Sequence, residues 1–386
     1  MNERLGVFLY SMGPGGAERV VSILLPELLR HYDVTLILMN ETLFHPVPEG
    51  VEIVWLERSR PDESGMAKLL KLPLLAWRFR KLCRLYGIDK VFSLMNRPNY
   101  VAVLGRMMGG AYGLAISERG TPSMQYAGNA FSARISRWLI RTLYPKADLV
   151  TTNSQGAARD LVERFGVPAS KLVVIHNPFD LEAIKKACRA SDKRAENGFT
   201  FISVGRLDEG KNHALLIDAF ARVYEPGMRL RIIGEGPLRE TLQKKIEKLD
   251  LVDAVTLEGA KKNPFACLAE ADAFVFASRH EGFPNVLVEA LACGLPVVST
   301  DCPSGPREIL GLSLREDVPP GCSRRAPFGL LVPVDDTAAM GTAMKEVYNN
   351  EILRKELASA APRRAAEFSK ERQVGNVLAV LERLPH

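Results

Sequence analysis

Patterns for metal binding and disulfide bonding are missing from the 386-residue sequence. Its six cysteines are scattered, no C-x-x-C pair occurs, and the six histidines show no zinc-ligand spacing with them. We therefore expect reduced thiols and no metal site. The sequence also has no uninterrupted apolar run of about 18 residues, the length that a membrane-spanning helix needs. Any membrane contact is expected to be peripheral.

An excess of charge of one sign is also lacking, because 51 Lys and Arg against 45 Asp and Glu leave a formal net charge of only +6. A balance this small does not indicate a nucleic-acid partner, so the positions of the basic residues matter more than their number. A chain of 386 residues is longer than one compact core usually allows. Two domains are therefore expected.

The first half of the chain alternates short apolar runs with helical patterns. A glycine-rich turn at Ser11–Gly16 precedes the predicted helix Ala17–Leu29. Strands are predicted at Leu5–Tyr10, Val34–Met39, Val51–Trp55, Lys90–Leu94, Gly113–Ile116, Leu149–Thr152 and Leu172–Ile175. Strands that alternate with helices indicate a parallel sheet covered on both faces. The segment His176–Asp180 is predicted to be a hinge.

The second half repeats this alternation. Strands are predicted at Phe199–Val204, Arg229–Ile233, Val255–Leu257, Ala273–Ala277 and Pro296–Ser299, and helices at Asn212–Val223, Leu238–Leu249, Asn285–Ala292 and within Asn349–Leu384. The predicted fold class is α/β, with two Rossmann-like domains at residues 1–178 and 179–386. The last helix is a candidate to return to the first domain.

Two carboxylates, Glu281 and Glu289, lie on either side of the start of the helix Asn285–Ala292. Pro284 suits the first helical position, and a helix N-terminus with free amides binds phosphate. Glu281 could then accept hydrogen bonds from sugar hydroxyls, and Glu289 could hold a ribose diol. The alternative is that Glu281 only caps the helix while Glu289 is solvated.

Further loops follow predicted strands at the expected carboxyl edge of each sheet. Gly205–Asn212 carries Arg206 and Lys211, two cations that could neutralise a diphosphate, although two solvated surface cations remain the alternative. Gly13–Arg19, Gly234–Pro237 and Glu258–Ala260 are glycine-containing loops where a backbone can approach a ligand closely.

Four motifs occur in one order: G-G-A-E-R, G-R-L-x-x-x-K-N, G-E-G-P and E-G-F-P-N-V-L-V-E. With them the whole chain resembles family 4 glycosyltransferases of the GT-B fold, in which two parallel sheets face each other across an inter-domain cleft. The resemblance implies that Arg206 and Lys211 bind the donor diphosphate, Glu281 the donor sugar and Glu289 the ribose. The donor contacts that it implies are Gly15, Gly16, Gly205, Arg206, Lys211, Gly234, Gly236, Gly259, Ala260, Glu281, Gly282, Phe283, Pro284, Asn285, Val286, Leu287 and Glu289.

One position departs from the family pattern. Many members carry Ser-Glu-His where this chain has Ser117-Glu118-Arg119. Arg119 is always charged and cannot act as a general base, so we expect it to hold an anionic acceptor or the donor phosphates. The alternative is a structural salt bridge to Glu118 or another acid. The predicted catalytic residues are Glu281, Arg206, Lys211 and Arg119. The predicted acceptor contacts are Glu18, Asn96, Arg97, Glu118, Arg119 and Tyr126.

The segments Leu9–Val21, 96–100, 143–148 and 205–214 are similar to transferases of bacterial protein N-glycosylation. That likeness implies retaining α-1,4 transfer of GalNAc from UDP-GalNAc to an undecaprenyl-diphosphate-linked diNAcBac-GalNAc acceptor. No D-x-D sequence occurs, so we predict no divalent metal and no cofactor beyond the UDP-sugar. The alternatives are transfer to another lipid-linked glycan, a GT-B nucleotide-sugar epimerase and a non-catalytic UDP-sugar-binding scaffold.

Two first-domain segments mix basic and apolar residues without a single acid. They are 66–86, which we predict to be a helix or helix pair broken near Pro73, and 131–146. This composition suits a helix lying on anionic lipid, although a core-facing helix with a solvated basic face would show it too. The protein is therefore predicted to lie at the cytoplasmic face of the bacterial inner membrane.

Overall fold

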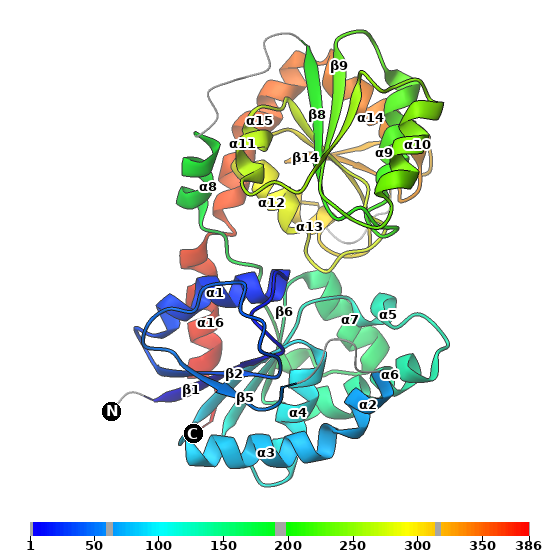
Figure 1. The fold of residues 1–386 in the computed structure, drawn as a ribbon. Helices are drawn as coiled ribbons and strands as arrows, with labels where there is room; N and C mark the ends of the chain where they lie inside the picture. The colour runs from blue at the N-terminus through cyan, green and yellow to red at the C-terminus, as the bar shows by residue number, and fades with distance from the viewer. Residues whose placement is uncertain (1–2, 59–64, 190–197, 313–317, 386) are drawn as a thin grey trace. The chain divides into compact units, whose positions relative to one another are not determined.

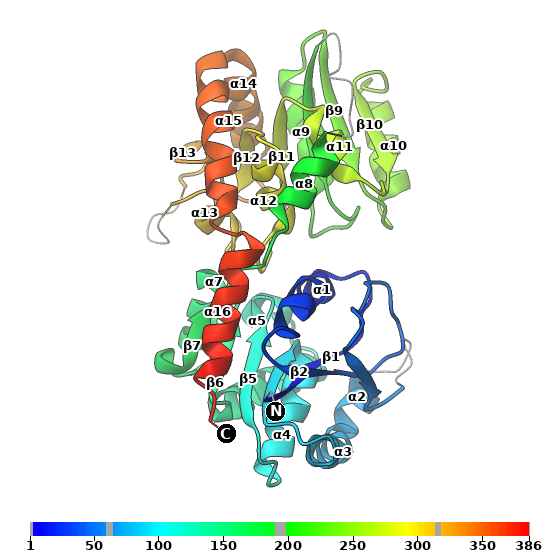
Figure 2. The same ribbon diagram turned by 90° about the vertical axis from the view of Figure 1, so that its left-hand side faces the viewer.

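The computed structural model describes residues 3–58, 65–189, 198–312 and 318–385. The chain forms two compact units (Figures 1 and 2). Unit 1 contains residues 1–179 and 370–386, and unit 2 contains residues 180–369. Where the chain leaves and re-enters unit 1, the amide of Lys370 donates to the carbonyl of Phe179 at 2.8 Å.

Unit 1 is built on a parallel sheet with the strand order β3-β2-β1-β4-β5-β6-β7. The order reverses between β1 and β4, so the loops after these two strands diverge to opposite faces of the sheet. The strands are β1 (Arg4–Leu9), β2 (Asp33–Leu38), β3 (Glu52–Trp55), β4 (Lys90–Leu94), β5 (Gly113–Glu118), β6 (Leu149–Thr152) and β7 (Leu172–Val174).

Helices cover both faces of this sheet because its central strands are apolar on both sides. Along β1, Leu5, Val7 and Leu9 pack with α1 and α16, whereas Phe8 stacks on Phe79 of α3 at 4.5 Å between ring centroids. The helices are α1 (Gly16–Leu28), α2 (Gly65–Leu70), α3 (Leu72–Leu85), α4 (Asn96–Met107), α5 (Pro122–Gln125), α6 (Phe131–Leu143), α7 (Gln155–Phe165) and α16 (Lys370–Glu382).

The last helix completes one of these faces. Figures 1 and 2 show α16 beside α1 on the sheet of unit 1. Its side chains Val374, Val377, Val380 and Leu381 enter the same core cluster as Leu5 of β1.

Unit 2 repeats the arrangement with the strand order β10-β9-β8-β11-β12-β14-β13. The order reverses between β8 and β11, and the pairing is parallel except for the antiparallel pair β13 and β14. The strands are β8 (Phe199–Val204), β9 (Met228–Ile233), β10 (Val255–Gly259), β11 (Ala273–Phe276), β12 (Val297–Thr300), β13 (Arg324–Ala326) and β14 (Gly329–Val332).

The helices of unit 2 pack against a core that includes Phe201, Phe220, Leu230 and Met344. They are α8 (Leu181–Cys188), α9 (His213–Val223), α10 (Arg239–Lys248), α11 (Pro264–Ala269), α12 (Asn285–Ala292), α13 (Pro306–Ile309), α14 (Thr337–Asn349) and α15 (Glu351–Ala366). No helix in the described parts of either unit is long and apolar enough to cross a membrane.

Candidate active site

In unit 2 the predicted donor loops gather where the strand order reverses. The loop after β8 carries Arg206 and Lys211, and the loop after the neighbouring strand β11 carries Glu281. Lys211 Nζ lies 2.5 Å from Glu281 Oε1, so an ion pair joins the two loops. Because ligands of open α/β sheets bind at such a reversal point, this edge is the candidate site.

Hydrogen bonds fix the backbone around Lys211. Asp208 Oδ1 accepts from the amide of Lys211 at 3.1 Å, and the amide of Arg279 donates to the carbonyl of Gly210 at 2.9 Å. Asn212 adopts a left-handed conformation (φ 52°), and its side-chain amide donates to Asp335 Oδ1 at 2.8 Å. Asp335 follows β14 and has no local sequence signal, so sequence reasoning missed it.

The side chains of the two predicted cations, Lys211 and Arg206, differ in how exposed they are. Lys211 is largely buried beside Glu281 and has its Nζ 5.6 Å from the centre of the Phe276 ring. The Arg206 side chain is 73% exposed, with its Nε 3.7 Å from Asp208 Oδ2. Lys211 therefore provides a fixed positive charge, while Arg206 can swing onto a ligand.

The glycines in the loops after β8 and β9 allow the backbones of these two loops to pack in direct contact. Gly234 has φ 147°, and a Cβ there would overlap the carbonyl oxygen of Gly205. A Cβ at Gly236 would overlap the backbone of Leu207, whose amide donates to the carbonyl of Glu235 at 3.0 Å. Loop packing thus requires glycine at both positions, whether or not a ligand also approaches them.

The loop after β10 joins the same edge. The amide of Gly234 donates to the carbonyl of Gly259 at 3.0 Å, and Gly259 has φ 76°. Ala260 follows it and is exposed. The predicted contacts Gly205, Gly234, Gly259 and Ala260 are therefore brought to one edge of the sheet.

The helix α12 corrects one prediction about its N-terminus. It begins at Asn285, and Pro284 is the extended N-cap residue (ψ 98°) rather than the first helical residue. The hydroxyl of Ser304 supports this turn by donating to the carbonyl of Gly282 at 2.8 Å. The residues Gly282 to Leu287 predicted to contact the donor therefore form this turn and the first residues of the helix.

The alternative reading of Glu289 is wrong, whereas nothing here tests whether Glu281 caps α12, whose N-cap residue is Pro284. Glu289 is only 5% exposed and is therefore not a solvated surface group. A carboxylate buried within the helix that follows the Glu281 loop is consistent with the predicted ribose contact, which stays a prediction.

Unit 1 contains the remaining predicted contacts. Gly15 is the N-cap of α1, and Gly16 is its first residue. A Cβ at Gly15 would overlap the carboxylate of Glu18, whose pKa is raised by burial. Gly15, Gly16 and Glu18 thus lie together at the carboxyl end of β1, next to the reversal point of this sheet.

Glu118 is the last residue of β5 and Arg119 follows it, but the two do not form the salt bridge that was the alternative for Arg119. Glu118 Oε1 accepts from the amides of Arg119 at 3.0 Å and Gly120 at 3.2 Å. Glu118 Oε2 accepts from the Tyr144 hydroxyl at 2.7 Å. The Arg119 guanidinium donates to Asn177 Oδ1 at 2.5 Å and Ser117 Oγ at 3.4 Å.

Burial dominates the electrostatics of this pair. Desolvation raises the pKa of Glu118 to about 7, against the lowering effect of its hydrogen bonds. Desolvation lowers the pKa of Arg119 to about 10, so its guanidinium still carries a charge at neutral pH. Tyr144 and Asn177 lie 26 and 58 residues from their partners, so sequence reasoning missed both.

The other predicted acceptor contacts lie at the start of α4 and after α5, and Tyr126 is close enough to Glu118 for that carboxylate to contribute, after burial, to its raised pKa. Asn96 and Arg97 begin α4, and Arg97 pairs with Glu57, its Nη2 lying 3.0 Å from Glu57 Oε2. Tyr126 follows α5, and its carbonyl accepts from Arg137 at 2.5 Å. Burial raises the pKa of the Tyr126 hydroxyl to about 12.

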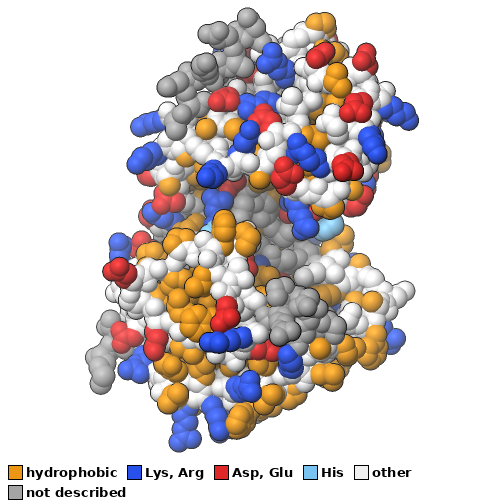
Figure 3. Space-filling view, viewed as in Figure 1, with side chains coloured by type: hydrophobic (Ala, Val, Ile, Leu, Met, Phe, Trp, Pro, Cys, Tyr) orange, Lys and Arg blue, Asp and Glu red, His pale blue; other side chains and the backbone are white. Residues whose placement is uncertain are grey.

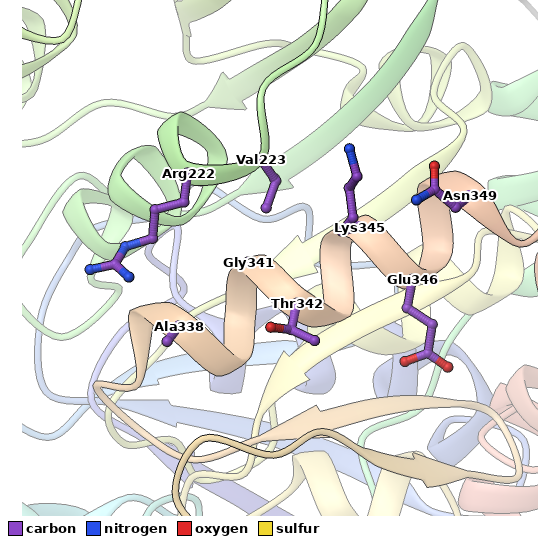
Figure 4. Close-up of a pocket in the computed structure, with 8 residues that line it drawn as sticks. All are labelled: Arg222, Val223, Ala338, Gly341, Thr342, Lys345, Glu346 and Asn349. Carbon is purple, nitrogen blue, oxygen red and sulfur yellow. The ribbon is translucent and has the colours of Figure 1, made fainter.

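A surface pocket of unit 2 lies elsewhere. Figure 4 shows this cavity of about 580 Å³ between α9 and α14. It is lined by Arg222, Val223, Ala338, Gly341, Thr342, Lys345, Glu346 and Asn349. None of these residues belongs to the predicted donor or acceptor contacts.

Comparison with known proteins identifies the family. The model described as "Glycosyltransferase Family 4" matches residues 14–183, and "Glycosyl transferases group 1" matches residues 185–364. The chain is 43% identical, over 98% of its length and 99% of the relative's, to a Campylobacter jejuni enzyme. That enzyme is named N-acetylgalactosamine-N,N'-diacetylbacillosaminyl-diphospho-undecaprenol 4-alpha-N-acetylgalactosaminyltransferase. This chain belongs to the family 4 glycosyltransferases.

Solved structures confirm the predicted fold of this family 4 glycosyltransferase. Anabaena HepE, crystallised with UDP, matches with a TM-score of 0.77 at 19% identity, covering 98% of this chain and 99% of its own. Sucrose-phosphate synthase from Thermosynechococcus elongatus matches with a TM-score of 0.79 at 17% identity, covering 99% and 98%. The fold is GT-B.

Proposed function

We propose that this glycosyltransferase moves N-acetylgalactosamine from UDP-GalNAc to undecaprenyl-diphosphate-linked diNAcBac-GalNAc in α-1,4 linkage. The observation that carries the proposal is the 43% identity to a transferase named for that acceptor, over nearly all of both chains. The proposed transfer retains the anomeric configuration of the donor sugar.

The proposed chemistry uses the cations at the edge of the unit 2 sheet. Lys211, fixed beside Glu281, and the mobile Arg206 stabilise the negative charge that develops on the departing diphosphate. The acceptor hydroxyl attacks from the face that the diphosphate leaves, and a diphosphate oxygen takes its proton. Two side-chain cations supply the charge stabilisation, so we propose that no divalent metal is required.

The two carboxylates orient the donor in this proposal. Glu281 lies at the ammonium of Lys211, which places a hydrogen-bond acceptor for the sugar next to the charge that binds the diphosphate. Glu289, buried on α12, binds the ribose. The loops after β8, β9 and β10, packed closely through their glycines, form the edge at which we propose that the nucleotide binds.

We further propose that unit 1 binds the anionic surface of the inner membrane at its cytoplasmic face. The segment 66–86 is a pair of helices, α2 and α3, that breaks at Lys71; Pro73 lies within the first turn of α3. Its exposed face carries Leu74 and Trp77, 50% and 44% exposed, and the ammonium of Lys81 lies 3.8 Å from the centre of the Trp77 ring.

A solvated basic face would not expose large apolar side chains in this way. On α6, Phe131 and Trp138 are 65% and 61% exposed, and the same helix carries Arg134 and Arg141. Figure 3 shows hydrophobic side chains interspersed with Lys and Arg over this unit. Aromatic and basic residues mixed on a surface are typical of proteins that bind anionic lipid.

Vesicle sedimentation tests the membrane proposal. Phosphatidylglycerol vesicles should bind the wild-type chain, and Trp77→Glu should weaken binding at least about tenfold, because it places a charge in the interface. Tyr224→Glu, on a 41% exposed aromatic of unit 2, is the matched control and should leave binding unchanged. Equal binding by the wild type and both variants would refute this surface.

Mass spectrometry of the product tests the transfer. The purified chain is incubated with UDP-GalNAc and undecaprenyl-diphosphate-linked diNAcBac-GalNAc, with UDP-GlcNAc and UDP-Gal in parallel reactions. The product should gain one N-acetylhexosamine with UDP-GalNAc alone, and an α-specific N-acetylgalactosaminidase should remove it. No gain with any donor would refute the proposed acceptor.

A second candidate is transfer in exopolysaccharide synthesis. The chain is 27% identical to the amylovoran biosynthesis glycosyltransferase AmsD of Erwinia amylovora, over 92% of this chain and 93% of the relative. This candidate requires that the N-glycan acceptor stay unmodified while another lipid-linked saccharide is extended. Epimerisation of the UDP-sugar without any acceptor would instead support the epimerase alternative.

A further inference from the structure

We infer that Glu118 is a positioning residue that acts through Arg119 and does not itself touch the acceptor. The sequence predicted both side chains as acceptor contacts, but the structure gives them different surroundings. The inference rests on the proposed function, because it concerns how unit 1 presents a cation to an anionic acceptor.

Glu118 has almost no exposed surface with which to contact a ligand. The residue is 1% exposed. Both of its carboxylate oxygens are occupied, one by the amides of Arg119 and Gly120 and the other by the Tyr144 hydroxyl. An acceptor could reach this carboxylate only by breaking buried hydrogen bonds, each of which costs free energy when it is left unmade.

The hydrogen bonds of Glu118 hold the backbone that carries Arg119. Glu118 holds the amide of Arg119, and the side chain of Asn153 donates to the Arg119 carbonyl at 2.9 Å. Both ends of this one residue are therefore fixed by side chains. An exposed arginine would lose considerable conformational freedom on binding an anion, and fixing its backbone and guanidinium in advance reduces that loss.

The Glu118 carboxylate is also anchored to helix α4 through Tyr144. The Tyr144 hydroxyl that donates to Glu118 also receives a bond from Asn99 Nδ2 at 3.3 Å. Asn99 Nδ2 donates in addition to the carbonyl of Ser117 at 3.0 Å. The chain from α4 through Tyr144 to β5 thus fixes both the carboxylate and the strand end.

Arg119 is the member of this group that remains accessible. It is partly exposed, and its guanidinium is directed by Asn177 and Ser117 rather than neutralised by an acid. Among the described residues it forms no ion pair with a carboxylate. A charged guanidinium that is oriented by two neutral side chains and forms no ion pair is suited to a phosphate or diphosphate group of the acceptor.

A double-mutant cycle tests the inference with the full chain. We compare kcat/KM for the lipid-linked acceptor in the wild type, Glu118→Ala, Arg119→Ala and the double variant. We expect Arg119→Ala to lower this value about 30-fold and the double variant to match it within about twofold, because Glu118 acts only through Arg119. The KM for UDP-GalNAc should stay unchanged in all variants.

The conservative variant separates positioning from charge. In Glu118→Gln the amide oxygen can still accept from both backbone amides, and its nitrogen can donate to Tyr144. Acceptor kcat/KM should therefore return to within about threefold of the wild type. If the effects of Glu118→Ala and Arg119→Ala instead multiply, or if Glu118→Gln is as impaired as Glu118→Ala, the inference is wrong.

A structural readout keeps the inference testable if transfer is not observed or if Glu118→Ala does not fold. Hydrogen exchange at the amides of Arg119 and Gly120 should be slow in the wild type and Glu118→Gln, and at least about tenfold faster in Glu118→Met, whose side chain has a similar length but no oxygen to accept from them. Equal exchange in all three would overturn the positioning role. Absence of transfer by a wild type with protected amides would refute only the proposed function.

Discussion

Replacing Glu118 with Gln should stabilise unit 1 at alkaline pH, and the sign follows from the burial of this carboxyl group. Its pKa rises from 4.5 to about 7 on folding, so the folded state holds a proton that the unfolded state has released between these values. The contribution of Glu118 to the free energy of unfolding is therefore fully present below pH 4.5 and is lost as the pH rises through 7.

The size of the effect follows from the same pKa values. A rise from 4.5 to about 7 corresponds to about 3 kcal/mol, at about 1.4 kcal/mol for each pH unit. Gln is neutral at every pH and does not incur this cost. The free energy of unfolding of Glu118→Gln relative to wild type should therefore increase by about 3 kcal/mol between about pH 4 and pH 8.

Urea unfolding monitored by tryptophan fluorescence measures this difference for unit 1 specifically. The three tryptophans of the chain, Trp55, Trp77 and Trp138, all lie in that unit. Glu163→Gln, on a 63% exposed carboxylate of the same unit, is the matched control and should show a difference that does not change with pH. A difference for Glu118→Gln that is equally flat would refute the reasoning.

Three further predictions concern unit 2. Lys211→Ala should lower kcat by about 100-fold to 1000-fold, because charge stabilisation at the diphosphate is lost. The control is Lys345→Ala, which should keep kcat within about twofold; Lys345 pairs with Glu225 and lines the pocket in Figure 4. Gly234→Ala should cost more than about 2 kcal/mol by calorimetry, since its Cβ overlaps a neighbouring carbonyl; a smaller cost would contradict the loop packing. Cys188 Sγ and Cys293 Sγ lie 3.0 Å apart, so oxidised glutathione should link these two thiols, and peptide mapping that finds neither cysteine in a disulfide would refute this.

The parts of the fold that the sequence predicted correctly are those with strong local patterns. The strands Lys90–Leu94 and Phe199–Val204 and the helix Asn285–Ala292 have the predicted bounds, because apolar runs bounded by turn residues specify them locally. The strands β13 and β14 were missed. They are three and four residues long, and their pairing with each other and with β12 is a tertiary property.

In the candidate site, too, local patterns were predicted from the sequence and tertiary contacts were not. The loops that carry Lys211 and Glu281 were predicted from sequence because each directly follows a strand, and parallel strands bring such loops to one edge. The functions of Glu118 and Arg119 could not be separated from sequence. Which of two adjacent polar residues is buried depends on Tyr144, Asn153 and Asn177, all more than 20 residues away.

The position of α16 determines the order in which the chain can fold during synthesis. Unit 2 is one continuous stretch, 180–369, whereas the face of the unit 1 sheet that α1 covers lacks the packing of Val377, Leu381 and Leu384 until these residues have been made. Translation therefore delivers unit 2 while part of the apolar core of unit 1 is still open to solvent. A chain truncated before residues 370–386 would leave this part of the core exposed and become a substrate for chaperones and proteases.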